Sequence, residues 1–148
     1  MSNLREIAAR GTAAFNTQDA DALAALDAPD VVTSAPGPAG RLNLEGQAAA
    51  REYNQTWFNA FPDGKITVNH EVIAEDSIVQ EGTFEGTNTG VWKSEGADMP
   101  PTGRTLKGKF CQVARVKEGL IVSSSLYYDQ VEVLTQLGLM PIPAPAGV

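Results

Sequence analysis

Apolar side chains recur every three or four positions in the first part of the chain, which is the spacing of helices with one buried face. The first stripe predicts a helix over 4–15, and Asn3 with Glu6 forms a capping-box pattern at its start. A second, short helix is predicted just beyond, with Thr17 or Asp19 as its N-cap. The chain therefore opens with two amphipathic helices.

A third, more aromatic helix is predicted from about 44 to 60. Its apolar face carries Ala50, Tyr53, Trp57 and Phe61. The segment 62–64, Pro-Asp-Gly, is a strong stop and turn signal after it. Before it, a β-branched run at 31–33 predicts a short strand, which the prolines and glycine of 36–38 end.

From Lys65 onward the apolar period changes to two, the period of half-buried strands. Strands are predicted at 65–72, 78–85, 104–116 and 120–129. A loop rich in glycine and proline, 86–103, separates the second strand of this set from the third. A short closing helix is predicted at 131–137, with Gly138 placed to end it.

Helices gathered ahead of antiparallel strands predict an α+β fold rather than a parallel α/β sheet. A sheet this long can bury the helices only by curling around them, and the open end of the curl becomes a pocket. The 148 residues, 43% of them hydrophobic, suit one domain. We place this domain at 1–138, and the prolines beyond it predict an extended tail at 139–148.

The formal net charge of −7 argues against nucleic acid or an anionic membrane as a partner, because both would repel the chain. The N-terminus lacks the apolar stretch of a signal peptide, and no segment approaches the roughly 20 apolar residues of a membrane span. We therefore expect a cytoplasmic protein. Cys111 and His70 are the only residues of their types, so the usual soft ligand set for zinc or iron is lacking and no metal site is predicted.

Three stretches of the sequence carry a family resemblance. They are 60–63 (Ala-Phe-Pro-Asp), 85–90 (Glu-Gly-Thr-Asn-Thr-Gly) with 101–104 (Pro-Thr-Gly-Arg), and 118–121 (Glu-Gly-Leu-Ile) running through Asp129 to 136–138. In their order and spacing they resemble the SnoaL-like polyketide (ester) cyclases of the NTF2-like superfamily. The resemblance covers most of the chain from the third helix onward.

The resemblance implies an NTF2-like cone, in which a curved antiparallel sheet wraps around three N-terminal helices. It also implies a homodimer, no cofactor, and a hydrophobic polyketide- or steroid-like substrate. Family cyclases close a ring by intramolecular aldol chemistry, with an acidic residue at the end of the last strand as general acid/base. Here that residue is Asp129. The chain departs from the family at Asn88, where many members carry histidine.

Asp129 could serve this chemistry if an apolar cavity raised its pKa. The other interpretation is that Asp129 only caps the closing helix, a common position for aspartate. It shares a strand row with Ser123, Ser125 and Tyr127, whereas Leu126 and Tyr128 form the more apolar row. If the apolar row faces the helices, Asp129 points away from the pocket unless a bulge shifts the register. The alternative is that the small serines leave room for a ligand on their row, while the apolar row packs against a dimer partner.

Further candidates come from strands, helices and the loop. His70 lies in an apolar strand row, so we expect it to point inward as a secondary catalytic candidate. Aromatic and polar side chains suited to a flat hydrophobic ligand are Trp57, Phe61, Phe84, Asn88, Trp92 and Tyr127. Of these, Trp92 is the candidate for a lid because it lies in the glycine-rich loop.

Three other functions stay open at this stage. A non-catalytic small-molecule binder or dimerisation module on the same fold gains weight from Asn88. An Asp-Arg-Asp arrangement of the epoxide hydrolase kind has candidate members in Asp98, Arg104, Arg115 and Asp129, although their spacing does not select it. A protein-transport adaptor would need an exposed apolar patch, for which the sequence gives no evidence.

Overall fold

The computed structural model describes residues 3–37, 40–93 and 98–140. Its helices are α1 (Leu4–Asn16), α2 (Ala20–Ala24), α3 (Gln47–Ala60) and α4 (Gln130–Gln136). The predicted caps of the first two helices are confirmed, because Asn3 accepts a hydrogen bond from Arg5 N and Asp19 accepts one from Ala22 N. From 141 onward, the predicted tail lies outside the described residues.

Six strands form a single sheet in the order β2-β1-β6-β5-β4-β3. The strands are β1 (Asp27–Gly37), β2 (Gly40–Glu45), β3 (Lys65–Ile73), β4 (Ser77–Thr87), β5 (Thr105–Lys117) and β6 (Leu120–Tyr128). Neighbouring strands are antiparallel except β1 and β6, which pair in parallel. That parallel pair joins the early part of the chain to its end.

The predicted strand at 31–33 is confirmed, but it is the middle of the much longer β1. The predicted start of the third helix near 44 was wrong, because the segment from 40 to 45 is a strand. Leu42 and Leu44 alternate with polar neighbours, which is the period of a strand. Gly46, with a positive φ of 93°, then turns the chain into α3, so that helix begins later than predicted.

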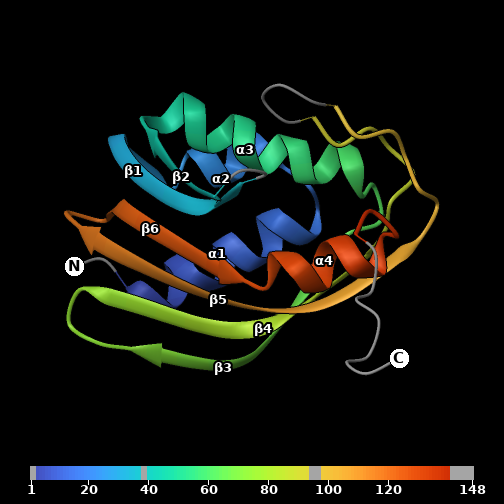
Figure 1. The fold of residues 1–148 in the computed structure, drawn as a ribbon. Helices are drawn as coiled ribbons and strands as arrows, with labels where there is room; N and C mark the ends of the chain where they lie inside the picture. The colour runs from blue at the N-terminus through green and yellow to red at the C-terminus, as the bar shows by residue number, and fades with distance from the viewer. Residues whose placement is uncertain (1–2, 38–39, 94–97, 141–148) are drawn as a thin grey trace.

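The predicted α+β architecture, a curved sheet around N-terminal helices, is confirmed. Figure 1 shows the sheet curving beneath and around the helices, with α1 inside the curve. Helix α1 packs on β3 and β4, α3 packs on β1 and β2, and α4 covers part of β5. One face of the sheet is thus turned toward the helices, and the other face, here called the outer face, is turned away from them.

The buried apolar side chains form two clusters. The first joins the end of α3 to the loop after β4 and to α4, through Trp57, Ala60, Phe61, Trp92, Leu106, Val133 and Leu137. The second joins α1 to β4 and β5, through Ile7, Ala8, Ile78, Ala114 and Val116. Within the part of the chain that the structure describes, no helix has the length and apolar character to cross a membrane.

Candidate functional site

A cavity of about 190 Å³ lies between the helices and the inner face of the sheet. Side chains of all four helices and of every strand except β2 contribute to its lining. It touches both apolar clusters, since Ile7 and Ala114 line it on one side and Trp57 and Leu106 on the other. Most of its wall is apolar, which suits a small hydrophobic ligand.

Aromatic rings form one wall of the cavity. Trp57 meets Phe84 edge-on at 5.3 Å and Tyr128 edge-on at 5.6 Å between ring centroids. Phe15 of α1 meets Phe84 in the same way at 6.2 Å. All four side chains line the cavity, so a ligand there would contact flat, rigid surfaces.

Asp27 is the only carboxylate among the described residues that line the cavity. It stands at the first position of β1, immediately after α2, and its side chain is half-buried. No donor among the described residues bonds its carboxylate, and burial raises its pKa from 3.8 to about 6. A carboxyl group with such a pKa can exchange a proton near neutral pH.

Two tyrosines supply hydroxyl groups to the same cavity. Burial raises the pKa of both Tyr53 on α3 and Tyr128 on β6, and each hydroxyl perturbs the pKa of the other. Tyr53 also donates to Pro36 O at 3.4 Å. Both phenols therefore stay neutral over the ordinary pH range and can donate hydrogen bonds.

The floor of the cavity is polar along one row of the sheet. Gln80 of β4 and Gln112 of β5 are directly paired and both face the cavity. Gln112 Nε2 donates to Ser124 Oγ at 2.7 Å, and Gln80 Nε2 donates to Glu71 Oε1 at 2.9 Å. These bonds use an amide N–H of each glutamine, and neither amide oxygen accepts a hydrogen bond from the described residues.

Comparison with known families places these features in context. A sequence model described as SnoaL-like polyketide cyclase matches residues 6–137.

The chain belongs to the SnoaL-like polyketide cyclase family.

Solved structures agree with this SnoaL-like assignment. IdmH of Streptomyces antibioticus, provisionally assigned as a polyketide cyclase, is 31% identical, with a TM-score of 0.71 over 90% of this chain and 97% of that one. A protein of Jannaschia sp. CCS1 with a provisional SnoaL-like polyketide cyclase assignment has a TM-score of 0.78 at 18% identity, over 93% and 92% of the two chains. A Catenulispora acidiphila protein with a ketosteroid isomerase-like fold, solved with trimethylamine, has a TM-score of 0.73 at 20% identity, over 91% and 94%. Curated protein sequences give no match.

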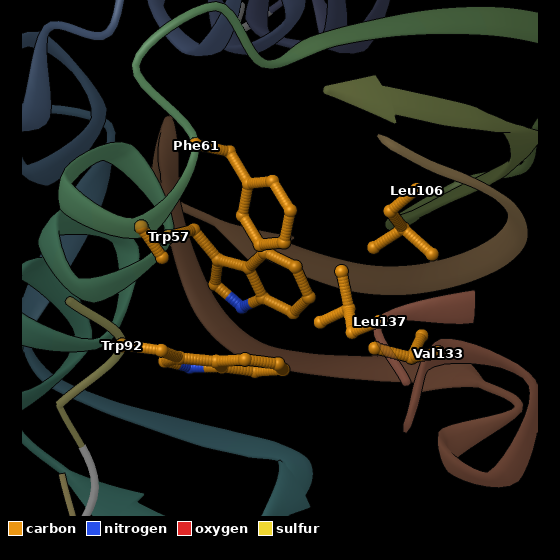
Figure 2. Close-up of a cluster of buried hydrophobic side chains, with 7 residues drawn as sticks. Trp57, Phe61, Trp92, Leu106, Val133 and Leu137 are labelled. Carbon is orange, nitrogen blue, oxygen red and sulfur yellow. The ribbon is translucent and has the colours of Figure 1, made fainter. Parts of the chain in front are cut away.

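The SnoaL-like structure brings only some of the predicted ligand contacts to the cavity. Trp57 and Phe84 line it, whereas Phe61 and Trp92 lie behind this wall in the first apolar cluster (Figure 2). Trp92 packs 5.0 Å from Trp57 and is 8% exposed. Its predicted role as a lid is therefore wrong, because its ring is core packing against a residue distant in sequence.

Asn88 lies in neither the cavity nor its rim. Its side chain is 2% exposed and makes four hydrogen bonds, donating to Ala60 O and Gly90 O and accepting from Thr102 N and Thr102 Oγ1. These bonds hold both ends of the loop after β4 against the end of α3. The predicted ligand contact of Asn88 is corrected to a structural clamp, since the side chain has no free donor.

His70 points to the outer face and is exposed, so the prediction that it faces inward was wrong. The register between β3 and β4 shifts between Val68 and His70. A bulge of this kind reverses which side chains face the core from that point on. The row 66, 68, 70, 72, which appears continuous in sequence, is therefore divided between the two faces.

Asp129 and Tyr127 also lie on the outer face. Tyr127 is 51% exposed, and the Arg41 guanidinium lies 4.3 Å from its ring centroid. Asp129 is exposed and caps α4, accepting a hydrogen bond from Glu132 N at 3.1 Å. The expectation that an apolar cavity surrounds Asp129 is wrong, because Leu126 and Tyr128 occupy the inward row. The register shift in β6 falls near Val122, too far back to turn Asp129 inward.

Sequence reasoning missed Asp27, Gln80, Gln112 and the pair of tyrosines as a group. Asp27 stands in a segment with several aspartates, and only its place at the start of β1 separates it from them. From Val31 to Gly37 the odd positions are more buried than the even ones, which marks a longer strand than was predicted, but this alternation does not extend back to Asp27. In 3–37, 40–93 and 98–140, no group of three or more His, Cys, Asp or Glu side chains is arranged to hold a metal ion.

Proposed function

We propose that this SnoaL-like protein is a cyclase- or isomerase-type enzyme that acts by general acid/base chemistry on a hydrophobic, polyketide- or steroid-like molecule held in the main cavity. The observation that carries the proposal is the cavity itself, with its aromatic wall, its polar row and its single carboxylate. Family membership supports the reaction type. We propose that the reaction needs no cofactor and takes place in the cytoplasm.

The cavity volume limits how much of the substrate is enclosed. An engineered protein cavity of about 150 Å³ is known to hold benzene. At about 190 Å³, this cavity suits a segment of one or two rings. A larger polyketide or steroid would leave its remaining rings outside the cavity as it stands.

A binding experiment tests the location of the site. The probe is 2-tetralone, a two-ring ketone, and its binding is followed by the change in tryptophan fluorescence, since Trp57 lines the cavity. Gly108 also lines the cavity, and a side chain added there meets only ordinary contacts. We expect Gly108→Leu to weaken binding at least about tenfold, because the new side chain occupies the ligand's space.

The matched control places the same leucine side chain on the preceding residue of β5. Lys107 is exposed and belongs to the opposite row of β5, so Lys107→Leu should bind 2-tetralone as the wild type does. Equal affinity in Gly108→Leu and the wild type would show that the ligand binds elsewhere and would overturn the proposal. Binding without any turnover or proton exchange would favour the alternative, a non-catalytic small-molecule binder.

We also propose a homodimer that forms through the outer face of the sheet. Val72, Val79 and Val113 are in register across β3, β4 and β5 on that face, and Val72 is 46% exposed. Such a row of exposed and half-buried apolar side chains is suited to burial by a partner. Sedimentation equilibrium should give twice the mass of the chain, and Val79→Lys should shift the equilibrium toward the monomer. A wild-type monomer at high concentration would contradict the dimer.

A further inference from the structure

We infer that Asp27 is the base that removes a proton from the carbon beside a substrate carbonyl. The inference rests on the proposed function, because it assumes that the substrate occupies the main cavity. It names both the reacting side chain and the substrate class, an enolisable ketone. Neither the family match nor the compared structures assign a role to this residue.

The backbone around Asp27 is fixed, although its carboxylate is unpartnered. Asp27 pairs with Ile121 of β6, and Ile121 N donates to Leu26 O at 2.9 Å. Gln47 Nε2 donates to Asp27 O at 3.3 Å. The strand, the preceding helix and α3 thus hold the main chain in place from several sides. A side chain positioned in this way, with its oxygens free, is suited to meet a ligand atom.

The other charged and titratable groups of the cavity leave Asp27 without a competitor. They are Tyr53 on α3, Tyr128 on β6 and Lys109 on β5, whereas α1, α2, α4, β3 and β4 contribute none to the described lining. The tyrosines hold their protons too firmly to act as bases. Lys109 is exposed and belongs to the same outer row of β5 as Lys107.

The proposed step conserves protons and electrons. The Asp27 carboxylate takes the proton, the electron pair of the C–H bond forms the carbon–carbon double bond of an enolate, and the carbonyl π electrons move to oxygen. Asp27 then returns the proton, either to a different carbon in an isomerisation or to the alkoxide formed when the enolate carbon attacks a second carbonyl. No further reactant is needed.

The test measures proton exchange at carbon, so the natural substrate is not required. 2-Tetralone in D₂O exchanges its α-hydrogens for deuterium, and ¹H NMR follows the loss of signal with wild type and variants. We expect Asp27→Asn to reduce the enzyme-catalysed exchange rate about 10²- to 10⁴-fold, the range typical of a general base, and to change the 2-tetralone Kd less than about threefold. Asp30→Asn is the matched control, because Asp30 is an exposed aspartate on the same strand. It should exchange at the wild-type rate.

A second measurement does not depend on any variant. Selective ¹³C NMR of the Asp27 carboxyl should titrate with a midpoint near 6, and the exchange rate should rise with pH around the same midpoint. Wild-type exchange in Asp27→Asn, no exchange by the wild type above buffer, or a titration near 4 would each overturn the inference. If 2-tetralone binding survives unchanged in Gly108→Leu, the proposed function itself fails, and that result is distinguishable from these.

Discussion

Two aspartates, each at a junction between a helix and a strand, have opposite surroundings. Asp27 lies where α2 gives way to β1, and its carboxylate faces the cavity without a partner. Asp129 lies where β6 gives way to α4, exposed and bonded to the backbone of that helix. The same side chain is thus prepared for proton transfer in one place and for helix capping in the other. The two carboxylates differ in their access to water and in their hydrogen bonds, although the residue type is the same.

The largest expected effect comes from removing part of the aromatic wall of the cavity. Trp57→Ala should lower the free energy of unfolding by about 3–5 kcal/mol, because it deletes a buried ring that packs on four other aromatic rings. Urea unfolding measures the effect.

Tyr127→Ala is the control for that change, since it removes an aromatic ring from the outer face. Tyr127 is 51% exposed and contacts Arg41, so the loss should stay below about 1 kcal/mol. Equal losses at the two positions would mean that the cavity wall is not part of the core.

A second change acts on the clamp behind the wall. Asn88→Ala should lower the free energy of unfolding by about 2–4 kcal/mol, because it removes one hydrogen-bond partner from the buried Ala60 O and from the part-buried Gly90 O and Thr102 N. Asn43 is exposed on β2, so Asn43→Ala should change it by less than about 0.5 kcal/mol. Urea unfolding of the two variants gives the comparison, and similar values would contradict the clamp.

The third change tests the burial of Asp27 through the dependence of stability on pH. The folded protein binds this proton more tightly than the unfolded chain, so Asp27 favours folding most below pH 4, and this contribution is lost as pH rises from about 4 to about 6. A rise in pKa from 3.8 to about 6 corresponds to at most about 3 kcal/mol, and to roughly half of that for a carboxylate with access to water.

Asp27→Asn removes this dependence, so the variant should gain about 1–2 kcal/mol relative to the wild type between pH 4 and pH 8. Urea unfolding of the wild type and the variant at both pH values measures this gain. The other carboxyl groups are the same in both proteins, so their contributions to the pH dependence cancel. Asp30→Asn should show no such gain. A constant difference between wild type and Asp27→Asn at all pH values would contradict the raised pKa.

The parts of the fold that the sequence predicts well are those with a local cause. The stripe of α1, its cap at Asn3 and the alternation of β4 to β6 depend on neighbours within a few residues. The bulge after Val68 depends on pairing with β4 instead, and it turned His70 outward against the pattern. Trp92 is buried because it meets Trp57, a residue far away along the chain.

The candidate site likewise has features with a local cause in the sequence and features that depend on distant contacts. Capping by Asp129 follows from a local pattern, an aspartate before a helix, and that interpretation was available from the sequence. The chemistry of Asp27 depends on a hollow built by nine separate elements, which no local pattern reveals. The family resemblance identified the family and the fold, but the environment of each carboxylate required the packed structure.

The smallest expected effect concerns Asp129, and it separates capping from catalysis. Asp129→Ala should cost about 1 kcal/mol, because the hydrogen bond to Glu132 N is lost, whereas Asp129→Asn should cost only a few tenths, since asparagine caps equally well. If Asp129 only caps α4, Asp129→Asn also keeps the 2-tetralone exchange rate. If Asp129 carries the proton, as the family resemblance implies, Asp129→Asn loses exchange as completely as Asp129→Ala despite its intact cap. Asparagine has the shape of aspartate but not its basicity, so the paired measurement of stability and exchange assigns the residue.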